Sequence, residues 1–506
     1  MFRKNRILYL LFAILILALL LQPISVLAEG ETDVLEEARR IYLRSIPHLF
    51  LASSILLAVI LLFGVYRHRE ELAERCREAA QERLFFVLLV SVGLLLRTVL
   101  ACLWGGHDVD INCFIAWGRC MADNGARVFY TDPATGMCDY PPGTILMLGG
   151  ITAVLRFLRI NLVSGAGIFA YMLPAYFADV AIALLVMQTA RRENRGEGWA
   201  LLLGALVIFN PAAVVLSGAW GQLDSLLTLL LLLCFLELMK GRRISAGAIY
   251  GLAVMCKWQA LIFGPVLAAA YLFTIRGKKD FLKTVGAVAA ALTVIFLISL
   301  PFRGDQKALW LVERFIEASG GYDYASVEAY NFLALLGGNW TESGEILFAS
   351  VSYQAFGTAV ILITVFTAVF VQWRSSRRER RCAENSGLSF RMLFLTAAFC
   401  IYTIYTFGHY MHERYVFPAV FLLIFVFLFT WDARFLFCSL LLSCVMFLNM
   451  STAMYVISNL ASRYVRSTPS HNTVVLICSA VETVSNLYFL SVFIDAASPA
   501  ESEGVQ

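Results

Sequence analysis

Residues 224–240 read DSLLTLLLLLCFLELMK, one aspartate followed by an almost unbroken apolar run. A helix of roughly 20 such residues spans the hydrocarbon core of a bilayer. Similar runs recur along nearly the whole chain. They predict further helices at 7–27, 47–66, 85–104, 144–160, 164–190, 200–217, 244–274, 282–300, 347–373, 390–408, 416–431, 433–450 and 474–494. The pattern therefore indicates one polytopic membrane domain.

The composition of the 506-residue chain excludes a soluble protein. Apolar residues, counted with Tyr, Trp and Cys, make up 60% of the chain, and charged residues make up only 15%. A soluble protein of this size has no interior large enough to hide so much apolar surface. We expect an all-α bundle of about 11 to 14 transmembrane helices.

Charged residues are segregated between the apolar runs, so the net charge of +4 says little by itself. Short basic gaps lie at 67–83, 191–195, 240–243, 276–283 and 374–381, and such gaps mark the cytoplasmic side of a membrane. Two longer gaps, 105–143 and 301–346, are acidic. We expect both to be exoplasmic, and we look for chemistry there.

Strict alternation of sides fails at two of the predicted helices. The run 164–190 should leave the cytoplasm but ends in Arg191 and Arg192, and the run 244–274 has basic residues at both ends. We therefore expect broken or re-entrant helices near Pro174 and near residues 257–259. Irregular backbone survives at membrane depth only where protein or a water-filled cavity satisfies it, so these breaks predict a cavity open to the outside.

The patterning divides the chain into six segments. These are a signal anchor or signal peptide (1–30), a second helix with a basic cytoplasmic loop (31–84), a core of helices (85–300) with an exoplasmic loop (105–143), a second exoplasmic loop (301–346), C-terminal helices (347–494) and a disordered tail (495–506). The twelve cysteines show no spacing typical of a metal site. Cys113, Cys120 and Cys138 share the first loop, where either one disulfide or three free thiols fits the sequence.

The first acidic loop begins with Asp108 and Asp110 directly after an apolar run and closes with Asp139, Tyr140 and two prolines. Between these ends, aromatic residues indicate an interfacial helix. A single loop aspartate is usually a solvated charge. Three aspartates that bracket an interfacial helix favour a functional site instead.

Two further polar groups interrupt apolar sequence. Trp220, Gln222 and Asp224 separate two predicted helices, and Asp224 fits either a helix N-cap or a charge that faces a cavity. Lys257 and Gln259 lie in the middle of a long apolar run. A lysine at that depth needs an anion or must extend to the membrane surface, and a lipid phosphate is a natural partner.

A polar cluster at 409–415 and a glycine-rich stretch near 339 complete the candidates. Arg414 can bind a phosphate through two hydrogen bonds with help from His412, or it can simply pair with Glu413. Asn339 and Trp340 combine an amide with an aromatic ring, which suits contact with a sugar, although the pattern is weak.

The order of these motifs resembles a family of membrane glycosyltransferases. The early aspartate loop is followed by DYPPG (139–143), WGQLDS (220–225), KWQA (257–260), LLGGNW (335–340) and HERY (412–415). This series is similar to that of the bacterial relatives of the glycosylphosphatidylinositol mannosyltransferases, which have the GT-C fold. The resemblance runs from about residue 85 to 430 and implies a GT-C-like bundle with its catalytic core at 85–300. It departs at Trp258, where relatives often have proline.

The resemblance implies an inverting transfer of a sugar, with mannose favoured, from a polyprenyl-phosphate donor to a glycan, glycolipid or protein acceptor. Asp110 would be the catalytic base because it stands four residues before Phe114, as the family pattern implies, and Asp108 is the alternative. The donor phosphate would bind to Lys257, His412 and Arg414. Substrate-positioning residues would be Asp139, Tyr140, Trp220, Gln222, Asp224, Gln259, Asn339 and Trp340. The protein would lie in the cell membrane with its active site on the exoplasmic face.

The implied chemistry requires no cofactor, because a phosphate is already a good leaving group. The spacing of Asp108 and Asp110 permits a divalent cation (Mg²⁺ or Mn²⁺), but the sequence identifies too few oxygen ligands for one. We expect the bilayer as a partner and no nucleic acid. The competing hypothesis is a multi-pass transporter or a flippase of lipid-linked saccharides, since broken helices and intramembrane charges are equally typical of transporters. The absence of visible repeats argues against it.

Overall fold

The computed structural model describes residues 57, 60–80, 84–136, 138–321, 323–381, 388–460 and 473–498. The chain forms two compact units, Met1–Arg67 and His68–Gln506. In the first unit, the described residues include the π-helix η1 (Ile60–Val65). The expected signal anchor or signal peptide at 1–30 lies outside the described residues.

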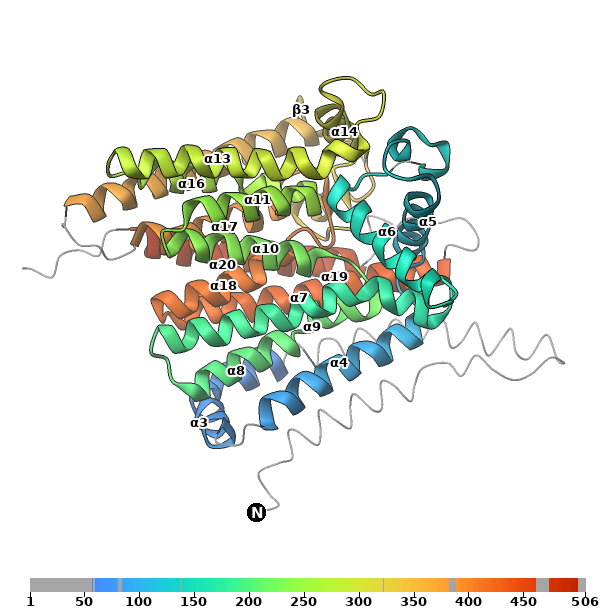
Figure 1. The fold of residues 1–506 in the computed structure, drawn as a ribbon. Coiled ribbons are helices and arrows are strands. Elements are labelled where there is room, and N and C mark those ends of the chain that lie inside the picture. Colours follow the sequence, from blue (N-terminus) through green and yellow to red (C-terminus); the bar gives the residue numbers. More distant parts are fainter. Residues whose placement is uncertain are drawn as a thin grey trace, which may run out of the picture. The chain divides into compact units, whose positions relative to one another are not determined.

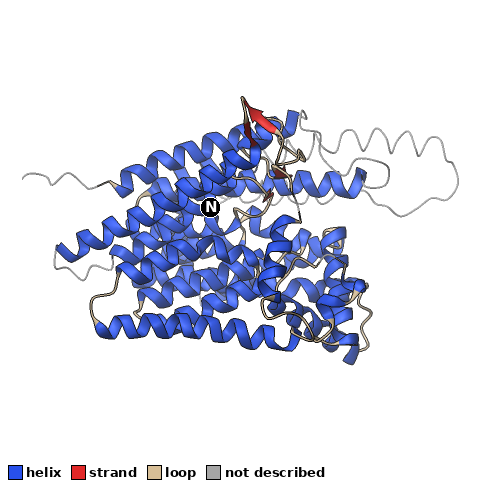
Figure 2. Ribbon diagram, turned by 90° about the horizontal axis from the view of Figure 1, so that it is seen from above, coloured by secondary structure: helices blue, strands red, loops and turns tan. Residues whose placement is uncertain are grey.

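The second unit confirms the expected all-α, polytopic architecture, and Figure 2 shows how little of it is strand. Eight helical stretches of the described residues are long and apolar enough to cross a membrane. They are α4 (Leu84–Trp104), α7 (Gly165–Arg192), the stretch of α8 (Glu197–Ile208), α9 (Pro211–Ala213) and η4 (Val214–Trp220), α13 (Lys278–Ser299) with η6 (Leu300–Phe302), α16 (Tyr353–Arg381), α17 (Leu388–Phe407), α19 (Ala433–Leu460) and α20 (Thr473–Ala497).

Shorter helices fill in between these spans. They are α3 (Arg69–Ala80), α5 (Asp108–Asn124), η2 (Phe129–Thr131), η3 (Pro133–Thr135), α6 (Pro142–Phe157), α10 (Asp224–Met239), α11 (Arg243–Cys256), η5 (Trp258–Phe263), α12 (Gly264–Phe273), α14 (Trp310–Gly320), α15 (Phe332–Leu335) and α18 (Phe417–Thr430). Helix α20 continues to Ala497, so the predicted tail begins later than residue 495.

The helix break expected near Pro174 is wrong, because α7 runs without interruption from Gly165 to Arg192. A proline removes only one helical N–H donor, and the rest of a long helix can hold. The chain changes direction at α6 instead, which at 16 residues is only about 24 Å long. Thr152 near the end of α6 bonds Tyr171 near the start of α7 (O–O distance 2.6 Å). Figure 1 shows α5 and α6 lying across one end of the bundle, so α7 begins at that end.

The break expected near residues 257–259 is confirmed. Helix α11 ends at Cys256, Lys257 is extended (φ −157°, ψ 131°), and the chain continues through η5 into α12. The two outer ends of this hairpin lie together, because the Arg243 guanidinium donates to the carbonyl oxygens of Tyr271 and Thr274 (3.0 Å each). The hairpin therefore enters and leaves at the same end of the bundle, and Lys257 lies at its tip.

Short strands tie the second long loop to the segment after α17. Strand β1 (Ser326–Val327) pairs in parallel with β4 (Met411–His412), and β2 (Ile346–Phe348) pairs antiparallel with β3 (Val351–Ser352). The packed aromatic core beneath the first loop includes Phe114, Trp117 and Phe302. Cys113, Cys120 and Cys138 are free thiols, so the structure favours the second of the two cysteine alternatives.

Candidate functional site

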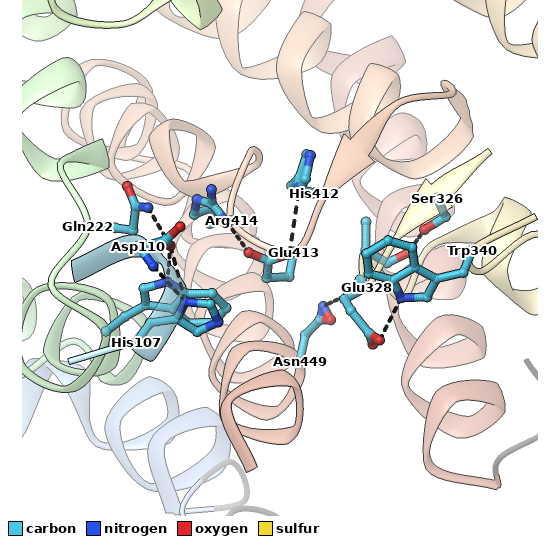
Figure 3. A network of polar contacts seen from close by, with 12 residues as sticks. His107, Asp110, Gln222, Ser326, Glu328, Trp340, His412, Glu413, Arg414 and Asn449 are labelled. Carbon is cyan, nitrogen blue, oxygen red and sulfur yellow. Dashed lines mark hydrogen bonds and ion pairs between the residues drawn. The ribbon is translucent and has the colours of Figure 1, made fainter. Parts of the chain in front are cut away.

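The candidate site lies where α5, α10, the tip of the α11–η5 hairpin and the segment after α17 meet. Each segment contributes polar side chains at a helix end or a helix break. Figure 3 shows Asp110 and Gln222 beside Arg414 and Glu413.

Asp110 lies in the first turn of α5 and is held by two N–H donors. The Trp220 indole Nε1 and the Gln222 amide Nε2 both donate to Asp110 Oδ2, each at 2.6 Å. His107 caps the same helix, since its Nδ1 accepts the Asp110 backbone N–H (3.3 Å), and its ring stacks on Trp220 with centroids 4.6 Å apart. These contacts fix one carboxylate oxygen of Asp110 and leave Oδ1 for a ligand.

The Asp110 carboxylate keeps its charge in this setting. Burial tends to raise its pKa, but the Arg414 charge, His107 and the two N–H donors outweigh burial and lower the pKa to about 2. Burial also lowers the pKa of the His107 imidazole, which fits a neutral ring whose Nδ1 accepts a hydrogen bond. Asp110 is therefore ionised at any physiological pH.

The orientation of the Gln222 amide is fixed by Tyr140. The Tyr140 hydroxyl donates to Gln222 Oε1 at 2.7 Å, which leaves the Gln222 NH₂ group facing Asp110. Tyr140 is itself held, because its carbonyl oxygen accepts the Tyr130 hydroxyl at 2.8 Å. The loop before α6 thus orients a side chain on the loop before α10.

Lys257 and Asp224 form a buried ion pair. Lys257 Nζ lies 2.6 Å from Asp224 Oδ1, and the Asp224 side chain has no solvent exposure. The Lys257 ammonium also lies 5.8 Å from the ring centre of Tyr140 and 5.7 Å from that of Tyr415. The structure decides between the two interpretations of Asp224: it is the first residue of α10, its side chain does not cap the helix, and it faces a cation.

Arg414 is the second cation of the site. Its Nε lies 3.9 Å from Asp224 Oδ2, its guanidinium lies 5.6 Å from the Trp220 ring centre, and its Nη1 donates to Glu413. Burial raises the pKa of Glu413, although Arg414 acts against this effect. Burial and the Arg414 charge lower the pKa of His412 well below its usual range, so His412 is neutral at pH 7.

A cavity of about 470 Å³ opens beside these charges. One part of its lining is polar and includes Asp139, Lys257, Gln259, His412 and Arg414. The other part is apolar and comes from η5, α12, α16 and α17: Leu261, Ile262, Pro265, Ile361, Val365 and Ile404. Gln259 lies at the boundary, where its Nε2 donates to the Tyr415 carbonyl oxygen at 2.5 Å. The cavity therefore suits an amphipathic ligand with an anionic group next to a hydrocarbon chain.

Asp139 lines the cavity, and Asp110 lies close enough for its charge to affect the Asp139 carboxyl. Burial and the Asp110 charge raise the pKa of the Asp139 carboxyl, while Arg414 and Lys257 act against them. A raised carboxyl pKa means that the folded state binds the proton more tightly than the unfolded state, so stability falls as the pH rises through the interval from 3.8 to the folded-state pKa.

We therefore predict that Asp139→Asn raises the thermal unfolding midpoint at pH 7. The neutral amide avoids the cost of burying a charge, and the difference from wild type should vanish below pH 3.8, where the carboxyl is protonated in both states. Thermal unfolding of both proteins across pH 3 to 8 tests this. A variant that is less stable than wild type at pH 7 would show that the ionised carboxylate is stabilising.

Three of the sequence-derived candidates lie apart from this arrangement. Asp108 is exposed on the first turn of α5. Asn339 Oδ1 accepts the Glu328 backbone N–H at 3.0 Å, and the Trp340 indole donates to Glu328 Oε1 at 2.8 Å. Figure 3 shows this second cluster around Glu328 and Asn449, separate from Asp110. Asn339 and Trp340 hold the second loop in shape beside β4 and do not line the cavity.

The sequence motifs predict no role for some residues that build the site. His107 is one of them, although it directly precedes Asp108, and Glu413 is predicted only as a partner for Arg414. Tyr415, Trp258 and Phe315 also line the cavity. A histidine at the junction of an apolar run and an acidic loop is a usable signal for a helix cap, but Phe315 lies on α14, far away in sequence.

The described part of the chain contains no group of three or more His, Cys, Asp or Glu side chains arranged to hold a metal ion. Around Asp110, two N–H donors occupy Oδ2 and leave Oδ1. The cations that line the cavity, Lys257 and Arg414, suit an anionic ligand.

Comparison with known families places part of the site inside a matched region. The family model described as glycosyltransferase family 87 matches residues 139–399, which include Tyr140, the Trp220–Asp224 loop and the Lys257 hairpin. A comparison with curated proteins gave no match. The aspartate loop at 105–138 and the segment at 409–415 lie outside the matched residues.

Proposed function

The chain belongs to glycosyltransferase family 87, and from that premise we propose that it transfers a sugar from a polyprenyl-phosphate donor to an acceptor on the exoplasmic side, with inversion at the anomeric carbon. Mannose is the sugar that the motif resemblance favours. Membership of a glycosyltransferase family favours the enzyme over the transporter or flippase alternative.

The shape and lining of the cavity carry the proposal for the donor. A polyprenyl phosphate joins an anionic phosphate to a long apolar chain, and the cavity offers Lys257 and Arg414 next to Leu261, Pro265 and Val365. Buried cations bind a phosphate strongly because little water competes for it. A nucleotide sugar would leave the apolar part of the cavity unused.

The positions of the charges suggest how transfer proceeds. The acceptor hydroxyl attacks the anomeric carbon, the bond from that carbon to the phosphate oxygen breaks, and Asp110 accepts the hydroxyl proton as the new bond forms. Attack from the side opposite the phosphate inverts the anomeric centre. Lys257 and Arg414 neutralise the charge that develops on the departing phosphate.

The low pKa of Asp110 fits this role once a donor is bound. Arg414 is the largest of the influences that together outweigh burial and lower that pKa in the free protein. A donor phosphate would share the Arg414 charge, so the Asp110 pKa should rise and the carboxylate should become a stronger base. The proton is also transferred late, when the attacking oxygen has become acidic.

The exoplasmic placement is supported by the distribution of basic residues. Arg191 and Arg192 end α7, Arg378 to Arg381 end α16, and Lys278 begins α13. Helix α7 starts at the site, so its basic terminus lies at the opposite end of the bundle. Basic helix ends are typical of the cytoplasmic side, which leaves the site on the exoplasmic side.

The test is sugar transfer by the purified protein from a radiolabelled polyprenyl-phosphate mannose. Wild type should transfer the sugar, and Val365→Trp, which fills the apolar part of the cavity, should raise KM for a long-chain donor by about tenfold because overpacking excludes the chain. A donor with a very short prenyl chain should be affected much less. Transfer from a nucleotide sugar and from no lipid phosphate would contradict the proposal.

The matched control is Leu362→Trp. Leu362 lies on the same helix as Val365 and is 66% exposed on the outer surface of the bundle. The indole there should leave KM near the wild-type value. Equal effects of the two tryptophans would mean that the apolar lining does not hold the prenyl chain.

A further inference from the structure

Two charged residues lie in the middle of membrane spans, away from the cavity. Arg97 is on α4 and Asp179 is on α7, and each side chain is only 1% exposed. Arg97 Nε donates to Asp179 Oδ2 at 2.9 Å, and Arg97 Nη1 donates to the carbonyl oxygens of Gly93 and Ile208. A charge at such depth is costly and is usually retained for a function.

The Arg97–Asp179 ion pair also contacts other polar groups, because two serine hydroxyls lie within hydrogen-bond distance of Asp179. Ser217 Oγ lies 2.7 Å from both Asp179 Oδ2 and the Ala213 carbonyl oxygen, and Ser225 Oγ lies 2.6 Å from Asp179 Oδ1. Arg97 Nε also donates to Ser217 Oγ at 2.9 Å. Each carboxylate oxygen of Asp179 therefore holds one serine.

The two serines enclose the loop that serves the site. Ser217 precedes Trp220 by three residues, and Ser225 directly follows Asp224. Between them lie Trp220 and Gln222, which bond Asp110, and Asp224, which bonds Lys257. The backbone is tightly packed at this point, since a Cβ on Gly218 would lie 3.1 Å from Arg97 Cα.

We propose that Arg97 and Asp179 are positioning residues for catalysis, which set the loop from Trp220 to Asp224 by holding Ser217 and Ser225. The proposal rests on the proposed function, because it assumes that this loop orients the catalytic base and the cations. Rigid hydrogen bonds at both ends of a short loop limit how far its side chains can move, and small displacements of positioning groups slow an enzyme strongly.

The alternative is an ion pair that only stabilises the fold. Removing one partner would not separate the two ideas, because an unpaired buried charge is strongly destabilising by itself. The serines offer a cleaner experiment. Ser217→Ala with Ser225→Ala frees the loop from Asp179 and leaves the Arg97–Asp179 ion pair intact.

The double serine variant is expected to lower kcat by about 10- to 100-fold, with a much smaller change in KM for the donor, because the cavity lining is unchanged. Ser439→Ala is the matched control. Ser439 is a buried serine on α19 that donates to the Val420 carbonyl oxygen, and it does not contact the site. The thermal unfolding midpoint of the double variant should fall by no more than about twice the decrease measured for the control.

A second measurement does not depend on activity. The backbone N–H groups of Gly221 and Gln222 both donate to the Leu216 carbonyl oxygen at 3.0 Å. Hydrogen exchange at these two amides, in ligand-free protein, should become at least tenfold faster in the double serine variant and should stay unchanged in Ser439→Ala.

The outcomes separate this proposal from the proposed function. Unchanged exchange would show that Asp179 does not hold the loop, and faster exchange with an unchanged kcat would show that the held loop does not matter for catalysis. Either result overturns the proposal. If wild type transfers no sugar from any lipid phosphate, the proposed function fails, and the exchange measurement alone decides whether Arg97 and Asp179 anchor the loop.

Discussion

Replacing Asp110 by asparagine is expected to lower the rate of sugar transfer by about 100-fold or more while the protein stays folded. The amide oxygen of asparagine can still accept the N–H groups of Trp220 and Gln222, so the local geometry should persist. What disappears is the negative charge and the ability to accept a proton. Transfer from polyprenyl-phosphate mannose, measured as kcat and KM for both proteins, tests this expectation.

A matched control for that experiment lies on the same helix. Asp123 is at the far end of α5, where it is exposed and pairs with Arg156, so Asp123→Asn removes the same charge without touching the site. Its rate should stay within about twofold of wild type. Full activity of Asp110→Asn together with an inactive Asp108→Asn would move the catalytic base to Asp108.

Replacing Lys257 by methionine should abolish transfer and also destabilise the protein. Asp224 has no solvent exposure, and Lys257 is its closest cation, with Arg414 Nε at 3.9 Å as a weaker partner. Loss of one partner of a buried ion pair costs about 3 to 5 kcal/mol, and the remaining contact with Arg414 places the expected loss at the lower end. Thermal unfolding in detergent measures the effect.

The double variant Lys257→Met with Asp224→Leu separates stability from function. Removing both charges leaves no unpaired group, so stability should return to near the wild-type value, while transfer should remain absent because the phosphate has lost a cation. Lys240→Met, which removes an exposed lysine paired with Glu237, should change neither property appreciably. Recovery of transfer in the double variant would exclude a role for Lys257 in binding the donor.

The architecture and most of the site could be predicted because their causes are local in sequence. Apolar runs of sufficient length specify spanning helices, and a lysine in the middle of such a run marks a break, as Lys257 does. Asp110, Gln222, Asp224 and Arg414 stood out because polar residues are rare in this chain and cluster between helices. The structure brings these residues together, as the ordered motifs suggested.

Other features depend on contacts that the sequence does not display. Pro174 is a strong local signal for a break, but helix α7 continues through it. The chain changes direction at α6 instead, and in the sequence α6 looks like any other apolar run. Arg97 and Asp179 are 82 residues apart, so nothing local indicates that they meet. Each is nevertheless a lone charge within an apolar run, and that signal could have marked both.

Asn339 and Trp340 show a limit of prediction from side-chain chemistry. An amide beside an indole suits contact with a sugar, and the motif resemblance implied that role. In the structure both side chains bond Glu328, whose backbone adopts a positive φ of 53° and needs support from its surroundings. Side-chain chemistry predicted that these residues make polar contacts, but only the tertiary structure identifies their partners.

The short helix α11 near the site has a consequence for the surrounding lipid. It is about 21 Å long, whereas the hydrocarbon core of a bilayer is about 30 Å thick. A protein face shorter than the bilayer draws the lipid surface inward. Headgroups beside α11 should therefore sit deeper than elsewhere, closer to the level of Lys257. The phosphate of the proposed donor would then reach the cations from the side, with its hydrocarbon chain still among its neighbours in the membrane.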